Sequence, residues 1–455
     1  MSSPALEGNE EEMIARESAG TARALGLWRS TALVVGNMVG SGIFLLPAAL
    51  AAYGGISVFG WAFSTAGAVL LALMFGRLSR LLPKVGGPYA YSARGFGDFI
   101  GFLVAWGYWI SIWCGNAAIA TAFVGYLGFF WAVLAENTMV AGAVAAGAIW
   151  FLSWVNAMGV RNAGIVQVAT TVVKLLPLIA IGTLGLFFFN VDNFRPFNLS
   201  GEPAFPAITA TAALTLWAFL GLESATVPAD DVSDPQKTIP RATVLGTVSA
   251  ATVYILGTVA VMGIIAPRML AHTTAPFADA ASAIWGNWAA YAVAAGAAIS
   301  CFGALNGWIL LQGQIPYAVA KDGLFPGPFG RLSGRGTPVV GIVVSSVLAT
   351  VLISLSYTRG LVEQFTFIIL LSTLTSLVPY VMCSMVELMI ADHGRRRWRL
   401  GSSLIPVLAF VFSLWAIAGA GRDTVYWGFL LLLAGVPVYV WMKRRRQALE
   451  LGGAT

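Results

Sequence analysis

Long runs of apolar residues, separated by short polar or Gly/Pro-rich stretches, fill most of the chain. A helix needs roughly 20 such residues to cross the hydrocarbon core of a bilayer. The runs do not alternate polar and apolar positions as the strands of a membrane barrel do, so each is predicted to be a helix. The pattern therefore predicts an all-α membrane protein with about twelve transmembrane helices. The predicted spans are 28–52, 56–82, 98–131, 138–157, 163–189, 205–228, 240–266, 282–318, 338–357, 361–389, 401–420 and 424–442.

Two of these helices are interrupted in the middle. The first contains Gly36-Asn37-Met38-Val39-Gly40-Ser41-Gly42, and the sixth contains Phe219-Leu220-Gly221-Leu222-Glu223. Interruptions at matching places in two halves of a chain are typical of transporters, in which the opened backbone binds the substrate near the bilayer midplane. Close helix packing is the alternative explanation of Gly-Ser-Gly. The matched pair favours a substrate site between the breaks.

Composition and charge support the membrane assignment. Apolar residues make up 58% of the chain and charged residues only 10%, against about 25% charged in soluble proteins. The net charge is +6, but the basic residues lie in short loops between the apolar runs. This distribution argues against a nucleic-acid partner. Of the 26 lysines and arginines, 21 fall on one side of the predicted topology and four on the other. This asymmetry predicts a bacterial-type inner membrane protein with both termini cytoplasmic.

The sequence offers little for a metal site or an enzyme. Cys114, Cys301 and Cys383 lie inside apolar runs, and His272 and His393 lie in loops on opposite sides of the membrane. They have no metal-ligand spacing. We therefore expect no metal, no cofactor and no membrane-embedded enzyme.

Two charged residues lie deep within predicted spans. Glu223 is beside the second break, where a carboxylate is functional by default because its insertion is unfavourable. It could bind a cationic ligand, gate the pathway or take up a proton; the alternative is a structural role with backbone donors. Lys174 lies midway along the fifth span, too deep to reach an interface easily, so it is also a candidate functional residue. The alternative is that its long side chain extends to one membrane interface.

Several neutral polar and aromatic side chains also occupy the spans. Trp217 and Trp308 could each present a ring face to an ammonium or guanidinium group. Tyr108, Asn116 and Ser372 could contact a substrate, although single residues of this kind more often form hydrogen bonds between helices.

These residues stand in motifs that resemble the amino acid–polyamine–organocation transporters. The motifs are Gly36 to Pro47 in the first span, Gly86-Gly87-Pro88-Tyr89-Ala90-Tyr91 after the second, Leu216 to Ala225 in the sixth, and Gly307-Trp308 followed by Asp322-Gly323-Leu324-Phe325-Pro326. Within that superfamily the chain is most similar to the bacterial arginine/agmatine antiporters of the basic amino acid/polyamine antiporter family. The resemblance covers about residues 25–445.

The resemblance implies a LeuT-like fold of two inverted five-helix repeats with broken helices 1 and 6, often in a homodimer. The implied parts are a disordered cytoplasmic tail at 1–25, a first repeat at 26–200, a second at 201–390, two further helices at 391–445, and a cytoplasmic tail at 446–455.

The resemblance also implies residue roles. Ser41 and Gly42 hold the substrate carboxylate, the second break holds its amine, Trp308 stacks on the distal cation and Trp217 closes over the substrate. The implied substrate site is Asn37, Gly40, Ser41, Gly42, Ser111, Asn116, Trp217, Leu220, Trp308 and Ser372. The implied gating or proton-linked residues are Tyr108, Glu223, Tyr380 and Lys174.

Three positions depart from the arginine/agmatine pattern. Ser111 and Ile112 reshape the pocket for the distal group. Lys174 resembles the fifth-helix lysine of sodium-independent relatives, whose ammonium takes the place of a sodium ion. We therefore expect a sodium-independent antiporter that exchanges a cationic amino acid for its amine. A neutral amino acid permease or exchanger of the same superfamily is the alternative.

Overall fold

The computed structural model describes residues 26–40, 42–82, 87–159, 176–223, 232–356, 360–391 and 400–452. The expected tail at 1–25, Ser41, Lys174 and most of the expected fifth span before residue 176 lie outside these ranges.

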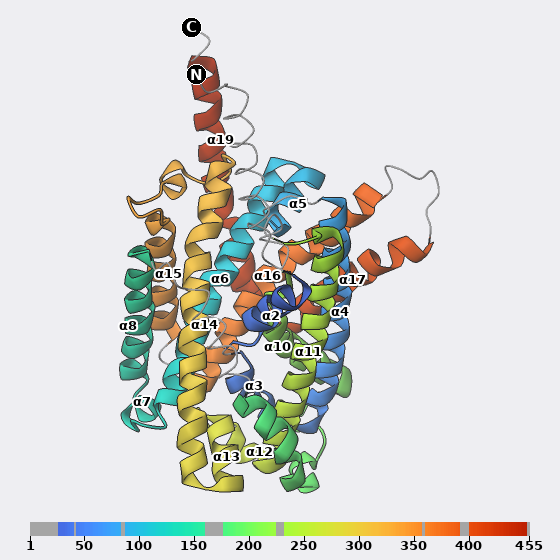
Figure 1. Ribbon diagram of the computed structural model, residues 1–455, viewed down its shortest axis with the longest axis vertical. Coiled ribbons are helices and arrows are strands. Elements are labelled where there is room, and N and C mark those ends of the chain that lie inside the picture. The colour runs from blue at the N-terminus through green and yellow to red at the C-terminus, as the bar shows by residue number, and fades with distance from the viewer. Residues whose placement is uncertain are drawn as a thin grey trace, which may run out of the picture.

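The described residues form helices separated by short connections (Figure 1). The α-helices are α2 (Leu27–Met38), α3 (Gly42–Ala51), α4 (Ser57–Leu81), α5 (Gly87–Phe96), α6 (Asp98–Leu127), α7 (Val133–Glu136), α8 (Thr138–Ala157), α10 (Ala204–Leu216), α11 (Pro235–Ile264), α12 (Pro267–Leu270), α13 (Pro276–Trp285), α14 (Asn287–Lys321), α15 (Val339–Ser356), α16 (Leu361–Ala391), α17 (Leu400–Gly419), α18 (Arg422–Leu433) and α19 (Gly435–Gly452). The 3₁₀ helices are η1 (Gly54–Ile56), η2 (Gly185–Phe188), η3 (Val191–Phe194), η4 (Trp217–Phe219) and η7 (Gly327–Gly330).

The described helices have the length and composition of membrane spans. Seven are long and apolar enough to cross a bilayer. Five shorter apolar helices, Gly42–Ala51, Leu176–Phe188, Ala204–Phe219, Val339–Leu355 and Ser403–Gly419, occupy the remaining predicted spans. The prediction of an all-α, multi-span membrane protein is confirmed.

Two connections were not predicted as helices. The loop after the second span contains α5. The predicted span 282–318 was wrong at its start, because its first residues belong to the separate helix α13, which ends at Trp285. Gly97 and Gly286, with φ of 82° and 83°, separate α5 from α6 and α13 from α14. An L-residue with a side chain rarely adopts this φ, so glycine allows the sharp turn between each short helix and the long one that follows.

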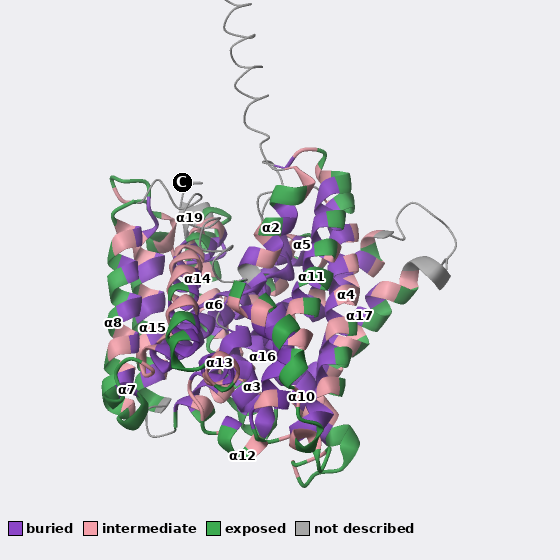
Figure 2. Cartoon of the chain, turned by 60° about the horizontal axis from the view of Figure 1, so that its bottom comes forward, coloured by how far each residue is buried: buried purple, intermediate pink, exposed green. Residues whose placement is uncertain are grey.

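The helix α6 forms the centre of the molecule. It packs most extensively against α14 and α16, and 89% of its most apolar window is buried inside the protein. Figure 2 shows buried residues concentrated around α3, α6 and α16, while exposed and intermediate residues mark the outer faces of α8 and α17. The break between α2 and α3 therefore lies in the interior, where a site can be shielded from lipid.

Candidate substrate site

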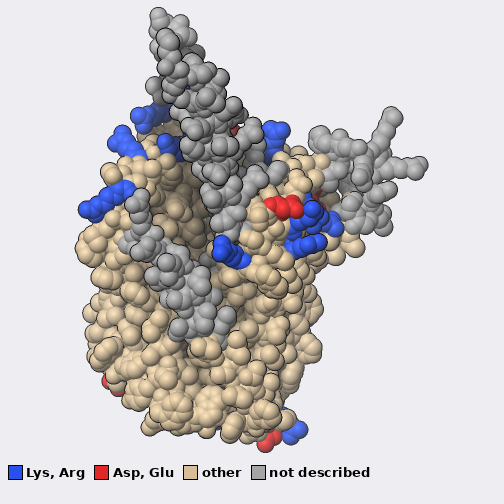
Figure 3. Space-filling model, in the orientation of Figure 1, with Lys and Arg blue, Asp and Glu red and all other residues tan. Residues whose placement is uncertain are grey.

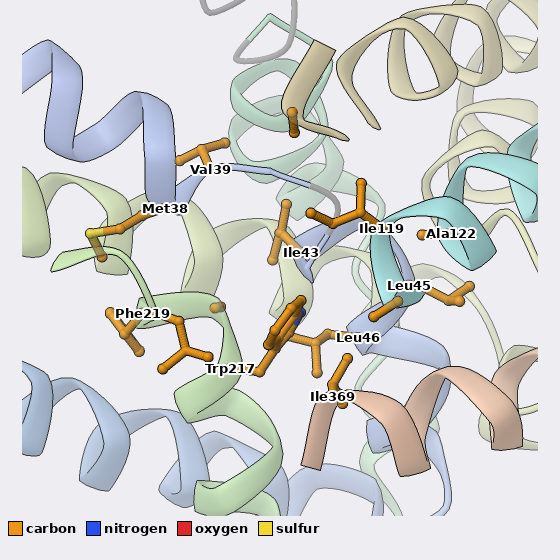
Figure 4. Packing of buried hydrophobic residues seen from close by; sticks show 14 of the residues in the cluster. Met38, Val39, Ile43, Leu45, Leu46, Ile119, Ala122, Trp217, Phe219 and Ile369 are labelled. Carbon is orange, nitrogen blue, oxygen red and sulfur yellow. The ribbon is translucent and has the colours of Figure 1, made fainter. Parts of the chain in front are cut away.

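The first break lies between α2 and α3. Val39 leaves the helical conformation with φ −74° and ψ 81°, and Gly40 N–H donates to the Met38 carbonyl at 2.8 Å. The helix resumes at Gly42. Figure 4 shows Met38 and Val39 at the end of one segment and Ile43 at the beginning of the next, with Trp217 beside them. The predicted interruption is thus present at the expected residues.

The second break follows α10. The helix tightens into η4, and Leu220 then turns to an extended conformation with φ −62° and ψ 137°. Gly221 has φ 96°, a conformation that an L side chain disfavours. Glu223 follows two residues later and is only 1% exposed.

A small cavity lies between the two breaks. It measures about 30 Å³, and both breaks line it together with α6, α14 and α16. Space of this size holds one or two water-sized molecules. An amino acid would fit only after the surrounding helices moved apart. The lining residues are Met38, Gly40, Gly42, Tyr108, Ser111, Ile112, Gly115, Ile119, Trp217, Ala218, Leu220, Gly221, Glu223, Trp308, Ser372 and Ser376.

Glu223 joins three helices at one edge of the cavity. Tyr108 of α6 donates its hydroxyl hydrogen to Oε1 at 2.7 Å, and Tyr380 of α16 donates to Oε2 at 2.7 Å. Both distances are normal for a hydroxyl donor and an oxygen acceptor. The structure brings together these three of the four expected gating residues. The fourth, Lys174, lies outside the described residues.

The two expected tryptophans both line the cavity. A Cβ at position 42 would lie 2.7 Å from Trp217 Nε1, so Gly42 lets the indole approach the backbone of the first break. Among the described residues, the buried Trp217 Nε1–H has no hydrogen-bond acceptor. Trp308, on α14, lines the same cavity and is only partly buried.

Serines form a polar patch where α6 meets α16. Ser372 donates its hydroxyl hydrogen to the Ser111 carbonyl at 2.8 Å, and the Ser111 hydroxyl also contacts Ser376. All three residues line the cavity. Ser376 was missed in the sequence, although it lies one helical turn beyond Ser372 and a periodic reading of the helix would have found it.

Asn116 was expected at the substrate, but it does not line the cavity. Its side chain is fully buried between α6 and α14, and Nδ2 donates to Gln312 Oε1 at 2.6 Å. Gln312 in turn donates to Ser346 Oγ at 2.8 Å. Asn116 is thus part of a polar network that connects α6, α14 and α15.

The remaining expected residues are described only in part. Gly40, Gly42 and Leu220 line the cavity as expected. Asn37 lies in α2, but its side chain is not among those described, and Ser41 lies in the undescribed part of the break. The sequence reading did not select the cavity residues Ile119 and Met38, since nothing distinguishes an apolar lining residue from an apolar core residue in a membrane helix.

A second set of contacts ties α5 to the end of α14. The Tyr89 hydroxyl donates to Asp322 Oδ2 at 2.9 Å. Burial, together with the nearby Asp322 carboxylate, raises the pKa of Tyr89, so the phenol remains a neutral donor at physiological pH. This bond joins the Gly86–Tyr91 motif to the Asp322–Pro326 motif, which are far apart in sequence.

Within the described ranges, His, Cys, Asp and Glu side chains form no group of three or more that could hold a metal ion. The polar groups of the cavity are hydroxyls, one carboxylate and opened backbone, which suit an organic ligand with ammonium and carboxylate groups.

Comparison with known proteins gives consistent matches over almost the whole chain. Residues 25–436 match the sequence profile of a family described as amino acid permease. The chain is 34% identical to a cadaverine/lysine antiporter of Escherichia coli K12, over 96% of this chain and 98% of that protein. It is 32% identical to a putative arginine/ornithine antiporter of Bacillus subtilis, over 93% and 97% of the two chains. It is 30% identical to a putrescine transporter of Haemophilus influenzae, over 91% and 96%.

Proposed function

Because this chain belongs to the amino acid permease family of the amino acid–polyamine–organocation superfamily, we propose that it exchanges a cationic amino acid for the corresponding amine across the membrane. Arginine and agmatine are the leading pair, with lysine/cadaverine and ornithine/putrescine as related pairs. The observation that carries the proposal is the cavity formed by both helix breaks, with Glu223 and two tryptophans on its walls.

Each end of such a substrate has a complementary group in the cavity. Opened backbone at the first break offers N–H donors to the carboxylate, and carbonyls at the second break offer acceptors to the α-ammonium. Trp308 presents an aromatic ring to the distal cation, an interaction worth up to about 2 kcal/mol when water is excluded. A substrate that is a zwitterion with an extra positive charge uses all three.

Glu223 and its two tyrosines act as a gate in this proposal. The carboxylate is bonded to α6 and α16 at once, so passage on that side requires both hydroxyl bonds to break. A cationic substrate attracts the same carboxylate and can compete with the tyrosines. Substrate binding and gate opening are thereby linked through one side chain.

Transport follows by alternating access around the cavity. Since the cavity of about 30 Å³ is too small for the substrate, the molecule must open to one side to load it. Inward movement of a cationic amino acid and outward movement of its amine, which carries one more net positive charge, is equivalent to exporting a proton. We propose that the exchange does not require sodium, on the basis of Lys174 in the fifth predicted span.

Two inverted repeats at 26–200 and 201–390 remain part of this proposal. The breaks at Val39–Gly40 and Leu220–Gly221 support them, as does a second matched feature. Each proposed repeat contains a ten-residue helix, a glycine with φ near 82°, and a long helix. Residues 391–445 follow as two further helices, and a homodimer is the expected assembly.

A neutral amino acid exchanger is the second candidate. Ile112, Ile119 and Met38 make part of the cavity wall apolar, which suits an uncharged aliphatic side chain. The same wall also suits the methylene groups of arginine or lysine, so the two candidates differ in the distal group alone.

Counterflow in proteoliposomes tests the proposal. Vesicles containing the purified protein are loaded with unlabelled arginine, agmatine, lysine, cadaverine, ornithine, putrescine or leucine, and uptake of labelled arginine is measured without sodium. We expect uptake only with a cationic amino acid or an amine inside. Uptake of labelled leucine into leucine-loaded vesicles, without uptake of labelled arginine under any loading, would identify the neutral exchanger. Uptake of labelled arginine into empty vesicles would exclude an exchange mechanism.

A further inference from the structure

A second cavity lies at the basic end of α19, away from the substrate site. Its volume is about 230 Å³, and its walls come from the beginning of α6, the turn after α14, and α19. The α19 side chains that line it include Lys443, Arg446 and Gln447. The Arg446 guanidinium lies over Gly323, with Nη1 4.0 Å from where a Cβ would be. Lys443 Nζ lies 5.9 Å from the centre of the Tyr439 ring.

This cavity is next to lipid. The candidate span Arg422–Gln447 has only 11% of its most apolar window buried inside the protein, the lowest value among the described spans. Trp441, two residues before Lys443, is 53% exposed. An exposed tryptophan followed by lysine and arginine is typical of a helix that leaves the hydrocarbon and enters the headgroup layer.

The charge of the cavity suits an anion. Lys443 and Arg446 contribute two positive charges and Asp98 one negative charge. Asp98 lies in the first turn of α6, where the helix dipole partly offsets its charge. Figure 3 shows lysines and arginines gathered at the end of the molecule from which α19 emerges. Leu324 and Met442 add an apolar wall, which a bare inorganic anion would not use.

We propose that this cavity binds the phosphodiester headgroup of an anionic membrane phospholipid, with Lys443 and Arg446 on the phosphate, Gln447 as a further donor, and Leu324 and Met442 against the glycerol and upper acyl chains. The lipid fills a space between α6, the α14–α15 turn and α19, and so holds the last helix against the body of the protein.

Two double variants distinguish a specific lipid site from non-specific electrostatic attraction between the basic end of α19 and anionic lipid. Lys443→Gln/Arg446→Gln removes two charges from the cavity. Arg444→Gln/Arg445→Gln removes the same charge from neighbouring residues that do not line it; Arg445 instead lies 5.9 Å from the Trp441 ring. The full-length proteins are delipidated in a neutral detergent and titrated with phosphatidylglycerol or phosphatidylcholine. Native mass spectrometry counts the bound lipids, and thermal unfolding reports the stabilisation.

We expect the unmodified protein to bind phosphatidylglycerol more tightly than phosphatidylcholine. The cavity variant should lose about tenfold or more of this affinity, because two positive charges beside the headgroup are removed. The control variant should lose much less. Equal losses in both variants, or none in either, would overturn the site. Displacement of the lipid by millimolar inorganic phosphate would overturn the assignment to a lipid headgroup.

Discussion

Trp308 is the residue on which substrate charge selectivity depends most in the proposed function. It lines the cavity from α14, together with the breaks that would hold the substrate's amino acid group. An indole face attracts a cation through its quadrupole, but it contributes only ordinary apolar contact to a neutral side chain.

We predict that Trp308→Ala weakens binding of arginine by up to roughly 30-fold, equivalent to about 2 kcal/mol. Binding of a neutral amino acid should weaken only a few-fold. Trp308→Phe keeps a ring face and should fall between the unmodified protein and Trp308→Ala. Isothermal titration or scintillation proximity binding measures the affinities. Equal losses for charged and neutral ligands would rule out the stacking role.

Asp279, in the short helix α13, gives the protein a pH-dependent stability away from the substrate site. Burial raises the pKa of its carboxyl group, and the hydrogen bond from the Thr273 hydroxyl only partly opposes this. A raised pKa means that the folded state binds the proton more tightly than the unfolded chain. The contribution of Asp279 to stability therefore decreases as pH rises from the ordinary value of 3.8 through the raised value.

We predict that Asp279→Asn raises the thermal unfolding temperature at neutral pH by about 1 °C. The difference from the unmodified protein should shrink as the pH falls through this window, because the native carboxyl group then becomes neutral as well. Thermal unfolding in detergent at a series of pH values measures the effect. A benefit that grows on acidification would contradict the assigned direction.

At the scale of elements, the two breaks pack against each other where the Trp217 indole lies next to Gly42. The first residue of α3 must lack a side chain because the indole of η4 occupies its place. The two interruptions, far apart in sequence, therefore act as one structural unit.

We predict that Gly42→Ala displaces Trp217 and lowers the thermal unfolding temperature by several degrees, since the new Cβ would lie 2.7 Å from Nε1. Gly40→Ala is the matched control, because its Cβ would lie at an ordinary 3.5 Å from the Ala304 Cβ. Thermal unfolding and tryptophan fluorescence report the change. Similar destabilisation by both variants would show that the breaks need flexible glycine rather than close approach.

The elements also show what a sequence can and cannot reveal. Glu223 and Gly221 stand out because a carboxylate and a glycine interrupt an apolar run. Asn116 stands out for the same reason, yet it faces Gln312 instead of the cavity. The side of a buried helix that a polar residue faces depends on its neighbours, and a membrane helix that is apolar all round gives no amphipathic stripe to indicate it. The turn at Gly286 was missed because apolar residues flank the Gly286-Asn287 pair on both sides.

At the scale of the whole molecule, the proposed topology places α19's basic end in the cytoplasm. The native cysteines Cys114, Cys301 and Cys383 are all buried, so introduced cysteines can be labelled against a low background. Gln447 and His272 are exposed and lie on opposite sides of the predicted topology.

We predict that Gln447→Cys reacts with a membrane-impermeant maleimide in inside-out vesicles and not in right-side-out vesicles, because 21 of 26 basic residues lie on that side. His272→Cys should show the reverse pattern. The extent of labelling on gels measures both. Labelling of both variants from the same side would contradict the proposed topology.

The buried Trp217 Nε1–H bears on how tightly the two directions of transport are coupled. An unsatisfied buried donor costs about 1–3 kcal/mol, and this indole N–H has no acceptor among the described residues. A carboxylate delivered between the breaks could accept that hydrogen and remove the penalty. A carrier without substrate would then change between its two access states roughly tenfold less often than a carrier with substrate. Uncoupled return of the empty carrier would stay rare without a further gating element.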